Sequence, residues 1–80
     1  MAEKKLINLI NLEENQNAII ISIAAGSRAT KRLADLGLIS GTPIKILRKS
    51  PFWGPVEIEA RGSKIALGRG LASKIFVHKI

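Results

Sequence analysis

Cysteine and tyrosine are absent from this 80-residue sequence, and histidine occurs once, as His78. Without cysteine there is no Cys–His nucleophile and no disulfide to staple a small secreted domain. A Ser–His–Asp triad would depend on a single histidine near the C-terminus. The segment Gly68-Arg69-Gly70 lacks the following glycine and the long helix of a phosphate-binding loop. We therefore expect a protein that is not an enzyme.

Long apolar segments are also lacking. The longest nearly apolar run covers residues 18–25, is interrupted by Ser22, and is far shorter than the ~18–20 residues that span a bilayer. Residues 4–7 (KKLI) resemble the start of a signal peptide, but no small-residue cleavage site follows them. Together with the absence of cysteine, this predicts a cytoplasmic protein.

Acidic residues are few. Thirteen Lys and Arg stand against six Asp and Glu, which gives a net charge of +7 and a pI near 10.4. The excess is concentrated in residues 41–80, which carry eight basic and two acidic side chains. Such a balance favours an anionic partner: nucleic acid, lipid headgroups or an acidic protein surface.

Short segments of alternating hydrophobicity, separated by turn residues, indicate one mainly β domain over residues 1–80. We predict five strands, at residues 18–24, 44–47, 56–61, 64–67 and 75–78, with Gly62 and Ser63 as a two-residue hairpin loop. The first strand is apolar on both faces, so its inward face stays undecided. Five strands in so small a chain hide their edges best as a barrel.

One short helix is predicted between the first and second strands, over residues 27–36. Ser27 is a candidate N-cap, and Leu33 and Leu36 fall on one apolar face. Gly37 is placed to end the helix in the left-handed conformation, with Leu38 making the hydrophobic contact of a Schellman motif.

Residues 31–46 (KRLADLGLISGTPIKI) resemble the central motif of the FeoA family, ferrous iron transport protein A. The resemblance continues through residues 50–56 (SPFWGPV), 61–69 (RGSKIALGR) and 72–77 (ASKIFV), and covers about residues 9–78. Two positions depart from the family pattern. Asn15 stands where a glycine is usual, a change that asparagine tolerates because it also adopts left-handed conformations, and Trp53 adds a large apolar group to a loop.

The resemblance implies an SH3-like barrel and a cytoplasmic accessory of bacterial ferrous iron uptake, which binds or regulates the FeoB permease and GTPase. Some members of the family bind transition metals, so the resemblance also raises direct Fe(II) binding. Ferrous iron favours two histidines and a carboxylate, whereas this chain has one histidine and Glu13-Glu14 lies in a predicted turn. We therefore expect no cofactor and no dedicated iron site, with His78 facing outward from its strand.

The loop at residues 51–55 holds two of the three aromatic residues, Phe52 and Trp53. Either one of them folds back to plug the barrel, or they anchor a partner, as exposed tryptophans do at interface hot spots. Arg48, Lys49 and Arg61 would then steer an acidic partner toward them. Gly37, Gly41 and Gly62 are interpreted as structural, and Glu57 and Glu59 as solvated partners of nearby cations.

These observations favour an interaction module for FeoB, with anionic lipid headgroups and self-association as further contacts. A basic barrel that binds nucleic acid without sequence specificity is an alternative, although the strands carry few aromatics for stacking. A stand-alone relative of the FeoA-like domain of metal-dependent repressors is another.

Overall fold

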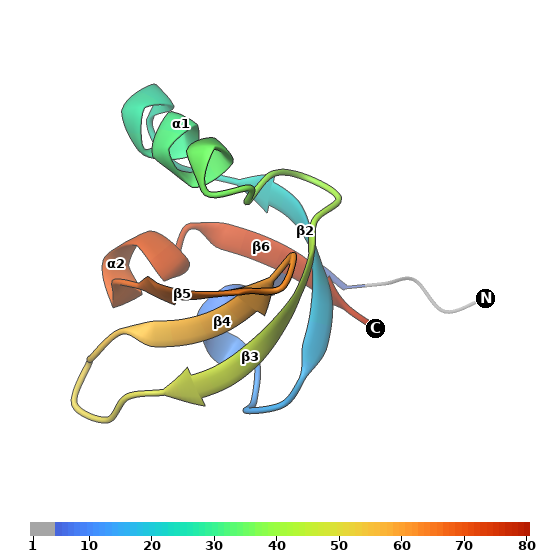
Figure 1. Ribbon diagram of the computed structural model, residues 1–80, viewed down its shortest axis with the longest axis vertical. Helices are drawn as coiled ribbons and strands as arrows, with labels where there is room; N and C mark the ends of the chain where they lie inside the picture. The colour runs from blue at the N-terminus through green and yellow to red at the C-terminus, as the bar shows by residue number, and fades with distance from the viewer. Residues whose placement is uncertain (1–4) are drawn as a thin grey trace.

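Six antiparallel strands form one curved sheet in the computed structural model, which describes residues 5–80. The order across the sheet is β1-β6-β2-β3-β4-β5. Figure 1 shows the strands curling around a common interior, with helix α1 at the top and the loop between β3 and β4 at the bottom. Along the chain the elements are β1 (Ile7–Asn8), the 3₁₀ turn η1 (Leu9–Asn11), β2 (Asn17–Ile23), α1 (Ser27–Asp35), β3 (Pro43–Lys49), β4 (Val56–Ala60), β5 (Ser63–Leu67), α2 (Arg69–Ala72) and β6 (Ile75–Lys79).

The mainly β, SH3-like architecture predicted from the sequence is confirmed, with one strand more than expected. The curved sheet does not close into a complete barrel: in the described residues β1 and β5 are its two edges. The additional strand, β1, pairs Ile7 with Val77 and Asn8 with Phe76 of β6. Two residues are too few to show alternation, so the sequence pattern carried no signal for this strand. The sheet bends at two register shifts, between Ile20 and Ser22 of β2 and between Ile46 and Arg48 of β3, because bulges increase local twist.

Alternate strand residues fill the interior. In β4 the inward residues are Val56, Ile58 and Ala60, as their alternation predicts. In β2 the buried residues are Ala18 and Ile20, which decides the face that the sequence left open. The rest of the core consists of Leu9, Leu12, Leu33, Leu38, Ile44, Ile46, Leu67, Ala72, Ile75 and Val77.

The η1 segment closes the core with two fully buried leucines, Leu9 and Leu12. The Asn8 side chain caps η1 by accepting a hydrogen bond from the Ile10 N–H at 3.1 Å. Lys49 Nζ donates to the carbonyl oxygens of Ile10 at 3.1 Å and Leu12 at 2.9 Å. Leucines of this segment thus fill the interior, and no aromatic residue is needed there. Asn15, in the turn that follows, has φ of 69°, as its left-handed tolerance predicts.

Helix α1 begins differently from the prediction. Gly26 is its N-cap, and no side chain caps it; Ser27 is the first helical residue, and its interpretation as N-cap is wrong. The Thr30 hydroxyl instead donates to the Ala25 carbonyl at 3.2 Å. The N-cap carries a β-region backbone, which Gly26 adopts at φ −62° and ψ 164°, so the helix starts one residue earlier than a Ser27 cap would place it.

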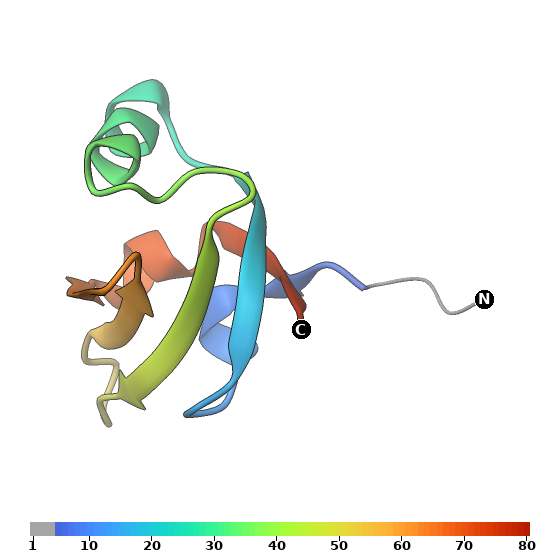
Figure 2. The same ribbon diagram turned by 45° about the vertical axis from the view of Figure 1, so that its right-hand side comes forward.

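The C-terminus of α1 is the predicted Schellman motif. The Leu38 N–H donates to Leu33 O at 2.8 Å and the Gly37 N–H to Ala34 O at 2.9 Å, with Gly37 at φ 85°. Leu33 and Leu38 are buried, but Leu36 is 51% exposed and does not share their inward face. The helix stands off the barrel in both views (Figures 1 and 2). The predicted core role of Leu36 is therefore wrong: Leu36 is the C-cap of α1, and the chain turns into the core two residues later, at Leu38.

The β4–β5 turn lies one residue earlier than predicted. Ala60 pairs with Ser63, so the two turn residues are Arg61 and Gly62, at φ 54° and 80°. Two left-handed residues make a type I′ turn, whose twist matches that of the strands. None of the helices in residues 5–80 is long and apolar enough to cross a membrane.

Candidate functional site: the β3–β4 loop

The loop between β3 and β4 presents Phe52 and Trp53 to solvent, 95% and 82% exposed. Both have left-handed backbones, with φ of 58° and 64°. A bulky residue rarely adopts this region, and two in succession store backbone strain. The interpretation of either residue as a plug of the barrel is wrong, since Leu9 and Leu12 fill the interior.

Hydrogen bonds and close packing hold this loop in one shape. The Ser50 N–H donates to Pro55 O at 3.1 Å, and the Gly54 N–H donates to Pro51 O at 3.2 Å. A Cβ atom at Gly54 would lie 2.7 Å from Ser50 Cβ, so only glycine fits. The loop is therefore braced from within, and its aromatics are presented without support from the core.

Arg69, at the start of α2, braces the loop from outside. Its Cζ lies 5.5 Å from the centroid of the Trp53 ring, a cation–π distance. Its Nη2 donates to Ser50 O at 3.4 Å. Its Nε is buried with no hydrogen-bond partner among the described residues. The sequence analysis missed Arg69, because nothing in the chain around it indicates that this residue packs against Trp53, sixteen residues earlier.

The three cations predicted to flank the aromatics lie in three different settings. Arg48 is exposed, two residues before Ser50, and its Cα partner across the sheet is Glu57. Lys49 turns its ammonium to the η1 carbonyls, and its N–H donates to Glu14 Oε2 at 3.3 Å. Arg61 lies at the opposite end of the β3–β4 hairpin, beside Gly37. Of the three, only Arg48 is an exposed cation on the strand that leads into the loop, opposite Glu57.

The glycines interpreted as structural, Gly37, Gly41 and Gly62, all have positive φ. A residue that the sequence analysis did not select, Thr42, is the buried polar residue of the loop after α1. Its hydroxyl donates to Gly37 O at 3.0 Å and accepts from the Ile39 N–H at 3.2 Å. This pair of bonds fixes the path from α1 into β3.

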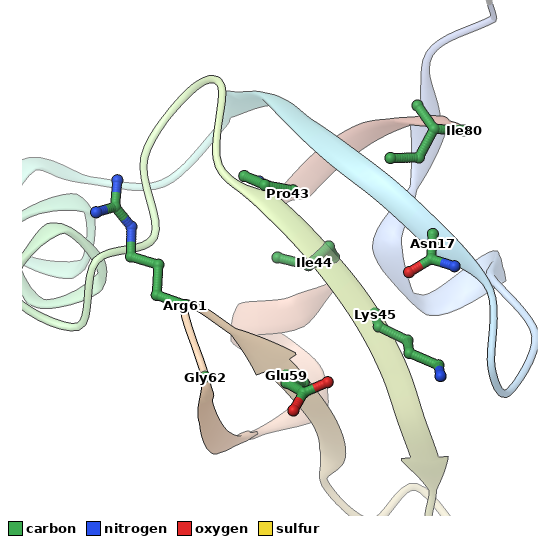
Figure 3. A pocket seen from close by; sticks show the side chains of 8 residues that line it. All are labelled: Asn17, Pro43, Ile44, Lys45, Glu59, Arg61, Gly62 and Ile80. Atoms are coloured by element: carbon green, nitrogen blue, oxygen red, sulfur yellow. The ribbon is translucent and has the colours of Figure 1, made fainter.

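A surface hollow of about 260 Å³ lies where β2, β3 and the β4–β5 turn meet. Figure 3 shows Lys45 and Glu59 on neighbouring strands of this hollow, with the Arg61 side chain directed toward α1. Lys45 and Glu59 are Cα partners in the sheet. One carboxylate beside two cations does not form a metal site or an acid–base pair.

Metal donors are dispersed in the part of the chain that the structure describes, where no three His, Asp or Glu side chains gather. His78 is half-buried on β6, and its Cα partner is Ile19 of β2. Glu14 is engaged by the Lys49 backbone. The described donors therefore do not gather into the set of two histidines and a carboxylate that ferrous iron favours.

Comparison with known proteins places the chain in a family. The FeoA domain model matches residues 7–79. "Putative Fe(2+) transport protein A" of Methanocaldococcus jannaschii is 43% identical over 66 residues, which cover 82% of this chain and 78% of that protein. The solution structure of an FeoA protein from Chlorobium tepidum superposes with a TM-score of 0.86 at 34% identity, covering 92% of this chain and 70% of that one.

A manganese-dependent transcriptional repressor superposes with a TM-score of 0.89 at 16% identity; the match covers all of this chain and 45% of the repressor. At that identity the likeness shows the fold alone. The family model and the two relatives agree with each other, and this chain belongs to the FeoA domain family.

Proposed function

We propose that this chain is a non-enzymatic, cytoplasmic accessory of ferrous iron uptake that binds the cytoplasmic, GTP-binding region of the FeoB permease through the β3–β4 loop. The observation that carries the proposal is the exposure of Phe52 and Trp53 on a loop held in one strained shape. Strain of this kind persists where the surrounding structure enforces it, and it clusters at functional sites.

The loop suits a protein partner. Rigid aromatic side chains supply contact area with little loss of conformational entropy on binding, and tryptophan leads among interface hot spots. The bracing by Gly54 and Arg69 pre-organises the loop before any partner arrives. Arg48 is an exposed cation on the strand that leads into the loop, and a positive charge there favours an acidic rim on the partner.

The test is calorimetric titration of Trp53→Ala against the purified cytoplasmic region of FeoB. A hot-spot truncation of this kind costs at least ~2 kcal/mol, or about thirtyfold in affinity. Leu36→Ala is the matched control, since Leu36 is also an exposed apolar residue, and it is the C-cap of α1 rather than part of the β3–β4 loop. A Trp53→Ala protein that melts normally and binds FeoB at full strength would refute the proposal.

Nucleic-acid binding is the second candidate, favoured by the net charge of +7. Its weakness is the lack of a stacking platform: Phe76 is half-buried on β6, and the other two aromatics share one loop. Binding driven by charge alone should be independent of sequence and fade steeply with salt. A defined oligonucleotide that holds its affinity at high salt would replace the FeoB proposal.

A further inference from the structure

Four exposed cations gather at the end of the molecule opposite the β3–β4 loop. Arg28, Lys31 and Arg32 belong to α1, and Arg61 belongs to the β4–β5 turn. We call this group the basic end. The Arg61 side chain reaches it by lying against Gly37, where a Cβ atom would be 3.2 Å from Arg61 Cδ. Figure 3 shows the same side chain directed toward α1.

Acidic residues balance little of this charge. Asp35 is the acidic residue of α1, and it lies one turn from two cations, Lys31 four residues earlier and Arg32 three residues earlier. Glu59, the nearest carboxylate of the sheet in sequence to Arg61, has Lys45 and Lys64 as its Cα partners on either side. One carboxylate of α1 thus stands against three cations of the helix, and a net positive charge remains at the basic end for an external anion.

Two apolar side chains lie among these cations. Leu36 is 51% exposed and Ile39 is 46% exposed. Arg28, Arg32 and Leu36 are spaced four residues apart, so they form one row along the helix. Leu33 faces the core, which turns this row toward solvent at the side of the helix. The row therefore has two positive charges and ends in an apolar side chain, on a helix that stands off the barrel (Figure 2).

We propose that the basic end binds anionic phospholipid membranes, with Leu36 and Ile39 entering the headgroup region. Clusters of four or more Lys and Arg bind anionic headgroups, and apolar side chains add affinity by leaving water. A polynucleotide would bind the cations but leave the side chains of Leu36 and Ile39 exposed to water. It would also find little to stack on, because Phe52 and Trp53 belong to the β3–β4 loop at the other end and Phe76 is half-buried on β6.

This inference goes beyond the proposed function and does not depend on it. The two surfaces lie at opposite ends of the longest axis of the molecule, which measures 36 Å. A chain with both surfaces can rest on the membrane with one end while the other end contacts a protein. Each surface can also be removed without touching the other.

The test is sedimentation of the whole chain with phosphatidylcholine vesicles, with and without phosphatidylglycerol. We expect binding only to the anionic vesicles. The triple variant Arg28→Gln, Lys31→Gln, Arg32→Gln keeps good helix formers and should bind about a hundredfold more weakly. The matched control, Lys5→Gln, Arg48→Gln, Lys79→Gln, removes the same charge from exposed sites away from α1 and should lose much less.

A double variant distinguishes binding to a membrane from binding to other anions. Leu36→Ser with Ile39→Ser should weaken vesicle binding by about tenfold and leave binding to a DNA duplex unchanged. Equal binding to neutral vesicles, equal loss in both triple variants, or full vesicle binding by the Leu36→Ser, Ile39→Ser protein would each overturn the proposal. Trp53→Ala should sediment with anionic vesicles like the unaltered chain. Loss of vesicle binding in that variant would show that the β3–β4 loop, and not the basic end, contacts the membrane.

Discussion

The two ends of this molecule expose apolar groups in different ways. At the β3–β4 loop, Phe52 and Trp53 are held by a strained backbone, a glycine that admits no side chain, and a stacked arginine. At the basic end, Leu36 and Ile39 follow a helix that reaches the core through Leu33 and Leu38. The first surface is fixed before binding, whereas the second combines diffuse charge with a lightly anchored helix. Fixed geometry suits recognition of one partner, and diffuse charge suits an extended anionic surface.

Leu33→Ala should lower the free energy of unfolding more than any other change considered, because Leu33 is the residue of α1 that is buried in the core. Truncation of a buried leucine typically costs about 2–5 kcal/mol, a large share of the stability of so small a domain. We expect α1 to detach or the whole chain to melt early, by circular dichroism. Ala34→Gly, at an exposed helical position, should cost only ~1 kcal/mol. If Leu33→Ala melts like the parent, the helix is not anchored as described.

Gly54→Ala tests the other end. The added Cβ meets Ser50 Cβ at 2.7 Å, and overpacking of this kind costs about 1–3 kcal/mol. We expect a lower melting temperature and weaker binding to the FeoB cytoplasmic region, because the loop must shift. Gly70→Ala is the matched control: its Cβ would meet nothing within 4 Å, and it lies in α2. That variant should be neutral or slightly stabilising.

Arg69→Ala should have a smaller effect on stability than Gly54→Ala. It removes a cation–π contact with Trp53, worth about 0.5–1 kcal/mol at an exposed site, and a long hydrogen bond to Ser50 O. The Trp53 ring should gain mobility, seen as lower fluorescence anisotropy. Arg69→Lys retains the charge without the planar stacking group and should give an intermediate value. Unchanged anisotropy in both variants would mean that Arg69 does not hold the ring.

Titration with ferrous iron under anaerobic conditions should change neither end. The described residues contain no cluster of three His, Asp or Glu side chains, and the chain carries a net charge of +7, which opposes a dication. We expect weak binding without fixed stoichiometry, and the same melting temperature with and without iron. One tight stoichiometric site would contradict this expectation and would show that the chain itself binds iron.

The sequence predicts most of the fold because its local signals are strong. The alternation in β4 and the glycine after α1 depend on residues close together in the chain, and both are confirmed. The direction of side chains that contact distant parts of the fold could not be predicted in this way. The Lys49 ammonium turns to the η1 carbonyls because they are unpaired in a short helical turn, and no spacing in the sequence reports that.

The β3–β4 loop was located correctly from its prolines and aromatics, but its surroundings were not. Arg61 is eight residues from Trp53 in sequence, yet β4 carries it to the far end of the hairpin. Arg69 is sixteen residues away and stacks on the ring. Proximity along a β-chain is therefore a poor guide to which charges surround a loop, because each strand moves the chain by its full length.

The exposure of Trp53 has a spectroscopic consequence. It is the single tryptophan of the chain, and 82% of it is in water when the protein is folded. Its emission should therefore resemble that of an unfolded protein already in the native state, and denaturation should shift it little. A blue shift would instead report burial of the loop against a partner. Trp53 fluorescence can therefore report binding of a partner to the loop, because folding alone should change its emission little.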